Sequence, residues 1–119
     1  MIDPKIEQQF ASAGSGSEVQ SLMLQWTEVP QPALFTDAKD KRARLQVLAD
    51  FYRVRKESAL RNLAAEDNLT VRDLPNSGSI ILTGPVSKLR TLVGKGSFLE
   101  RLEGVEVLPN IQYQALASV

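Results

Sequence analysis

The longest regular pattern in the chain lies between Thr36 and Glu66. Apolar side chains recur there every three or four positions, with polar side chains on the opposite side, which is the period of a helix with one buried face. No Gly or Pro occurs between Pro32 and Pro75, and Thr36 or Asp37 can cap the start of such a helix. We predict about seven turns that end near Ala65 or Glu66, with a buried face made of Leu45, Leu48, Ala49, Tyr52, Ala59 and Leu63.

Four shorter segments have the apolar and β-branched composition of strands: residues 19–27, 69–74, 79–83 and 105–108. Pro75-Asn76-Ser77-Gly78 supplies turn residues between the second and third, so these two form a hairpin. A second helix is expected at 86–102, interrupted at Gly94-Lys95-Gly96 and stopped by Gly104.

This order of strand, helix, strand, strand, helix, strand predicts a ferredoxin-like α+β domain with a four-stranded antiparallel sheet. Because each βαβ crossover is right-handed, both helices lie on one face of the sheet. The small-residue run ASAGSGS at 11–17 buries too little apolar surface to offset its ordering entropy. We therefore expect a flexible lead-in or linker remnant at 1–17, a folded domain at 18–110 and an extended tail at 111–119.

The strands do not alternate strictly, as a sheet with one solvated face should. Residues 22–24 and 80–82 are consecutively apolar, and Val107 precedes Leu108. We expect Met23, Ile81 and Leu108 to lie on the face that the helices leave bare, where an apolar patch marks a surface for a partner. A deeper core, or a dimer formed sheet to sheet, would explain the same pattern.

The end of the chain has a pattern of its own. Residues 111–119 alternate large apolar and polar side chains without Gly or a charge. Such a segment can pair as an added strand with a partner, with side chains entering alternate pockets. A short edge strand folding back on its own sheet accounts for the pattern equally well.

Composition narrows the function further. Acidic and basic residues balance at 14 each, so no long-range field favours nucleic acid or a membrane surface. The chain has no His and no Cys, which removes the usual zinc ligands and the Ser-His and Cys-His pairs. We expect no metal, no cofactor and no enzymatic activity, and residues 1–10 have no signal-peptide pattern.

Residues 18–116 resemble the propeptides of subtilisin-like serine proteases and the related free-standing protease inhibitors. The most specific part is the end: Ser79 to Thr83, the helix from Val86 to Leu102, and the run Gly104-Val105-Glu106-Val107-Leu108-Pro109-Asn110-Ile111-Gln112-Tyr113. This run resembles the closing strand of that family and the turn that follows it.

The resemblance implies that the bare sheet face packs on two surface helices of the protease. Polar residues after the last strand cap the N-termini of those helices, where carboxylates and amides accept unpaired N–H groups. The two capping positions fall on Leu108 and Asn110; Leu108 departs from the pattern, and Glu106 substitutes only with a shift in register.

The resemblance also places the tail in the substrate cleft. Tyr113 enters the fourth pocket and Leu116 the first, with Gln114 and Ala115 between them. In an alternative register, Val119 enters the first pocket and Leu116 the fourth.

The function implied is that of an inhibitor and intramolecular folding chaperone of a subtilisin-like protease, acting in cis or in trans. Its location would then be secreted or exported as part of a precursor. The alternative from the residues alone is a ferredoxin-like module that binds a small ligand or dimerises and has no protease partner. In that case Gly84-Pro85 and the Gly94–Gly96 segment would shape the ligand pocket.

Overall fold

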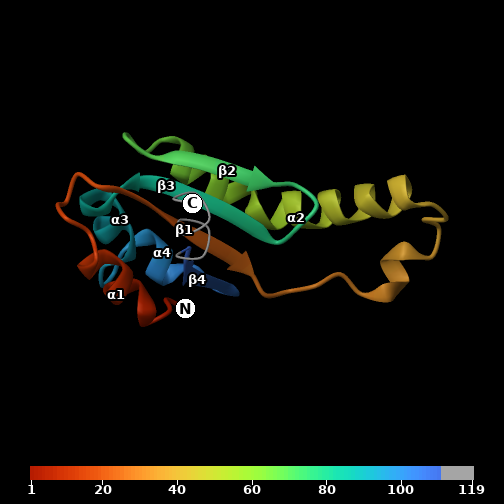
Figure 1. Cartoon of the computed structure of the whole chain (residues 1–119). Helices are drawn as coiled ribbons and strands as arrows, with labels where there is room; N and C mark the ends of the chain where they lie inside the picture. The colour runs from red at the N-terminus through yellow and green to blue at the C-terminus, as the bar shows by residue number, and fades with distance from the viewer. Residues whose placement is uncertain (111–119) are drawn as a thin grey trace.

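The computed structural model describes residues 1–110 and contains one sheet of four antiparallel strands (Figure 1). They are β1 (Val19–Trp26), β2 (Thr70–Leu74), β3 (Ser79–Pro85) and β4 (Val105–Pro109). Their order across the sheet is β2-β3-β1-β4, so β3 and β1 are the central strands. The predicted α+β architecture with a four-stranded antiparallel sheet is confirmed.

The helices are α1 (Lys5–Ala11), the 3-10 helix η1 (Pro32–Phe35), α2 (Lys41–Ala64), α3 (Val86–Val93) and α4 (Phe98–Arg101). The predicted interruption of the second helix at the glycines separates α3 from α4. The long helix α2 ends where predicted, but its cap is Asp40, whose Oδ1 accepts from the backbone N–H of Ala43 at 2.7 Å. The expected cap at Thr36 or Asp37 is wrong. Thr36 follows η1 directly, and its hydroxyl donates to the carbonyl of Ala33.

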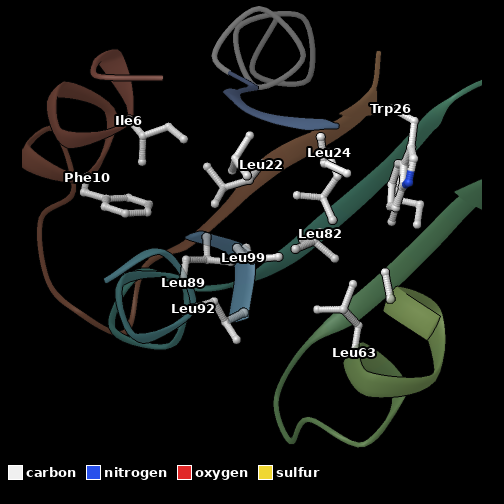
Figure 2. Close-up of a cluster of buried hydrophobic side chains, with 14 of the residues drawn as sticks. Ile6, Phe10, Leu22, Leu24, Trp26, Leu63, Leu82, Leu89, Leu92 and Leu99 are labelled. Atoms are coloured by element: carbon white, nitrogen blue, oxygen red, sulfur yellow. The ribbon is translucent and has the colours of Figure 1, made fainter. Parts of the chain in front are cut away.

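The core lies on one face of the sheet. Alternate residues of β1, Leu22 and Leu24, pair across the strands with Leu82 and Ile80 of β3, and all four are fully buried. Figure 2 shows side chains from α1, α2, α3 and α4 gathered against this face. Since strand side chains alternate between faces, the helices that pack on the core within residues 1–110 cover one face of the sheet. None of them packs on the other face, which we call the uncovered face.

The N-terminal residues belong to this core, which corrects the expectation of a flexible lead-in at 1–17. Ile6 and Phe10 of α1 are each 1% exposed and point into the cluster beside Leu22 (Figure 2). Ile2 forms a parallel bridge with Val107 of β4. Residues spaced by four lie on one helix face, so Ile6 and Phe10 supply the apolar burial that the run at 11–17 lacks.

A buried cation holds the β2–β3 hairpin against α2. Lys56 of α2 is completely buried, and its ammonium lies within 3.0 Å of four oxygens. These are the carboxylate of Asp73 and the backbone carbonyls of Leu74, Ser77 and Ser79. An ammonium has three protons, so one is shared, and every donor of the buried charge is used.

Replacing Phe10 with Ala tests whether α1 is part of the folded core. We expect Phe10→Ala to lower the free energy of unfolding by about 3–5 kcal/mol, the range for truncating a buried aromatic side chain. Urea denaturation followed by circular dichroism measures it, with Gln8→Ala on the exposed side of α1 as control. A loss below about 0.5 kcal/mol, as for a surface substitution, would contradict this role.

Removing the ammonium of Lys56 leaves four oxygens without their shared donor. We expect Lys56→Met to destabilise the protein by about 3 kcal/mol or more, the cost of breaking a buried charged network from one side. The matched control is Arg61→Met, also on α2, whose ion pair with Glu57 is exposed and is worth less than about 1 kcal/mol. Equal losses of unfolding free energy in the two variants would contradict a stabilising role for the buried Lys56 network.

Candidate functional site

The uncovered face of the sheet carries one apolar row across three strands. Met23 of β1 is paired with Ile81 of β3 on one side and with Leu108 of β4 on the other. Directly opposed residues have side chains about 5 Å apart, so the three are neighbours, and each is half-buried. The structure therefore brings together the three residues predicted for this face.

Polar pairs flank the row on both sides. Toward one end, the hydroxyls of Ser21 and Thr83 are hydrogen-bonded at 2.8 Å. Toward the other end, the hydroxyl of Ser79 donates to Oε1 of Gln25 at 2.6 Å. These bonds satisfy the hydroxyls of Ser21 and Ser79, which are themselves buried, so the apolar row lies between two hydrogen-bonded polar pairs.

Charged side chains stand at the two outer strands of the same face. Arg72 of β2 is paired with Ile81, and Glu106 of β4 is paired with Gln25. Both charged residues are exposed. A shallow hollow of about 230 Å³ opens beside β4, lined by Met1, Asp3, Pro4, Glu106 and Leu108. This edge therefore combines a carboxylate with an apolar recess.

The two polar capping candidates, Asn110 and, with a shift in register, Glu106, lie in different surroundings. Glu106 is exposed on the uncovered face, whereas Asn110 is 7% exposed. The backbone N–H of Asn110 donates to Oε1 of Gln9 in α1 at 3.0 Å. Its side-chain Nδ2 is buried and has no hydrogen-bond partner within residues 1–110. Glu106 is thus accessible to solvent, whereas Asn110 is buried.

The residues assigned to a substrate cleft, Tyr113, Gln114, Ala115 and Leu116, lie outside the described residues, as does Val119. The described chain ends at Asn110, directly after β4. The starting point of the tail is therefore defined, at the β4 edge of the sheet.

A second exposed surface was not predicted from the sequence. The first turns of α2 extend beyond the sheet and run beside η1 (Figure 1). Leu45, predicted as core, is only half-buried there, whereas Leu48 is half-buried and packs against the core. A groove between the two helices is lined by Leu34, Val47, Asp50, Phe51 and Arg55. Residues 28–47 thus form a projecting arm, which we call the η1–α2 arm.

An ion pair closes the base of this arm. The guanidinium of Arg55 donates twice to the carboxylate of Glu28, at 2.9 and 3.1 Å, and lies 3.5 Å from the ring centre of Phe51. The hydrogen bonds from Arg55 lower the pKa of Glu28 and raise the pKa of Arg55. The sequence pattern does not predict this pair, because Glu28 and Arg55 are far apart in the sequence and meet only after the chain has turned through η1.

The described part of the chain shows no features of a metal centre or a membrane anchor. No group of three or more acidic side chains within residues 1–110 is arranged to hold a metal ion. None of its helices combines the length and apolarity needed to cross a bilayer. No protein-family model, curated protein or solved structure matches the chain. The candidate site is thus an apolar row between polar pairs, on the sheet face that carries no described helix.

The Glu28–Arg55 pair makes stability depend on pH. Because the pKa of Glu28 is lowered in the folded state, the pair stabilises the protein above the unfolded-state pKa, about 4.3, and this contribution is lost as pH falls through the folded-state pKa. We expect wild type to be more stable than Glu28→Gln by a constant amount above about pH 5.5, with the difference disappearing toward pH 3.

Urea titrations of both proteins across this pH range measure the difference. Arg55→Gln should likewise be less stable than wild type above about pH 5.5, and this difference should also shrink toward pH 3, because the variant lacks the same pair. A difference between wild type and Glu28→Gln that persists unchanged at pH 3 would contradict this assignment.

Proposed function

We propose that this protein is an inhibitor of a subtilisin-like serine protease, built on a ferredoxin-like fold and docking through the uncovered sheet face. The observation that carries the proposal is the Met23–Ile81–Leu108 row. It lies across β3, β1 and the edge strand β4, on the face away from α1, α2, α3 and α4. An apolar strip left on a small domain commonly marks a protein-binding surface.

The strand arrangement supports the ferredoxin-like part of the proposal. The order β2-β3-β1-β4 places the first and third strands at the centre, and α2 and α3 connect strands that are not consecutive neighbours. In this arrangement the two crossovers bring both helices to the same side. The uncovered face is then a direct result of connectivity.

The edge of β4 supports the choice of partner. Exposed Glu106 stands on the docking face beside Leu108, and a carboxylate there can accept from the free N–H groups at the start of a partner helix. Glu106 is therefore the proposed capping residue of the free protein. Tyr113 to Leu116 follow closely in the chain and are proposed to occupy the substrate cleft of the same protease.

The same docking serves the second proposed role, that of folding chaperone. A preformed domain that binds two helices of the protease holds them in their native arrangement. Binding energy from the sheet face then stabilises the folded protease over its unfolded chain by mass action. Inhibition follows from the same contacts because the tail occupies the cleft.

A charge placed at the centre of the face tests the docking surface. We expect Met23→Lys to weaken inhibition of a subtilisin-type protease at least about tenfold, because the ammonium must be desolvated against apolar partner surface. The matched control is Val54→Lys on α2, whose parent side chain is 66% exposed and lies away from the sheet. Inhibition constants for wild type and both variants provide the measurement.

A version of the protein that ends at Asn110 separates the tail from the sheet face. It should retain the fold and lose most of the inhibition. Failure of the wild type to inhibit any of several subtilisin-type proteases would overturn the proposal. Concentration-dependent dimers that Met23→Lys abolishes would then favour sheet-to-sheet self-association, which the same apolar row supports.

A further inference from the structure

Gln9 of α1 connects three parts of the chain that are distant in sequence. Its side chain is 2% exposed. Its Nε2 donates to the carbonyl of Ser21 in β1 at 2.8 Å, and its Oε1 accepts the backbone N–H of Asn110 at 3.0 Å. Its own backbone carbonyl accepts from Nε2 of Gln20 at 3.1 Å. One buried amide thus joins α1, β1 and the residue that follows β4.

The residues before α1 hold the outer edge of β4. The N–H of Val107 donates to the carbonyl of Met1 at 2.8 Å, and the N–H of Asp3 donates to the carbonyl of Val107 at 2.9 Å. On its other edge, β4 is paired with β1 from Leu22 to Trp26. The last strand is therefore held on both edges, once by the sheet and once by the N-terminus.

Asn110 is the point at which this double attachment ends. Its backbone N–H has a side-chain acceptor in α1, so the attachment depends on Gln9 as well as on the sheet. Ile6 and Phe10 anchor α1 in the core, which fixes the position of Gln9 between them in the sequence. The position of Asn110, the last described residue, is consequently set by α1 as well as by the sheet.

We propose that residues 1–11 act as a latch that fixes where the C-terminal segment leaves the sheet, with Gln9 as its positioning residue. The latch is a property of the free protein. Its effect on inhibition rests on the proposed function, in which the segment after Asn110 enters a cleft. A start point that is already fixed lowers the ordering cost of placing that segment.

Hydrogen exchange of the Asn110 amide tests the latch directly. In the wild type, this amide should be protected, although it lies beyond the last strand. In Gln9→Leu, we expect its exchange to accelerate at least about tenfold more than that of the Leu82 amide, which reports global stability. Gln9→Asn, whose amide is one methylene shorter and remains polar, should accelerate Asn110 in the same way.

The matched control is Ile6→Val, which weakens the packing of α1 without removing a hydrogen bond. It should accelerate Asn110 and Leu82 by similar factors. An Asn110 amide that is unprotected in the wild type would overturn the latch. So would an acceleration in both Gln9 variants no greater than that of Leu82.

Inhibition of a subtilisin-type protease supplies the second readout. We expect Gln9→Leu to inhibit at least about tenfold more weakly than Ile6→Val. Equal inhibition by the two, with Asn110 exchange accelerated only in Gln9→Leu, would overturn the positioning role. A wild type that does not inhibit would overturn the proposed function instead, and the exchange data would still decide whether the latch exists.

Discussion

Burial of one face of the two central strands is the constraint on which the rest of the structure depends. Leu22 and Leu24 on β1 face Leu82 and Ile80 on β3, and no part of these side chains remains accessible to solvent. Every described helix that contributes buried residues does so on this side. Because alternate residues of a strand point to opposite faces, the residues between them are left on the second face. The apolar row at Met23, Ile81 and Leu108 is therefore produced by the same packing that forms the core.

The features that the sequence predicts well are those that depend on local composition and on the spacing of neighbouring apolar residues. Strand positions, the end of the long helix and the break at Gly94 follow from local composition and spacing. The sheet-face residues also follow, because consecutive apolar residues in neighbouring strands must occupy both faces whatever the exact register. Each of these features depends on residues that are close together in the sequence, so it can be predicted without knowing which distant segments come into contact. The tail assignments from Tyr113 onward rest on the family resemblance alone.

The features that were missed depend on contacts between distant residues. Ile2, Ile6 and Phe10 are spaced as on one helix face, yet the small-residue run after them outweighed this signal and suggested a separate lead-in. Lys56 interrupts the apolar stripe between Tyr52 and Ala59. Its burial could not be predicted from α2 alone, because the carbonyls that accept its hydrogen bonds come from the β2–β3 hairpin. The η1–α2 arm departs from the core pattern because α2 is longer than the sheet it crosses (Figure 1), which no periodicity in α2 reveals.

The strand β4 shows how the two ends of the described chain share one element without competing for it. Val105 and Val107 point into the core, whereas Glu106 and Leu108 belong to the uncovered face. The N-terminal residues attach to the outer edge of this strand, and α1 packs on the core side through Ile6 and Phe10. A partner seated on the Met23–Ile81–Leu108 row would therefore leave α1 and Gln9 uncovered. Met1 and Asp3, however, line the hollow beside Glu106 and Leu108. A substitution at Gln9 therefore acts on Asn110 from the core side alone, whereas a substitution at Met1 or Asp3 also alters the proposed docking side.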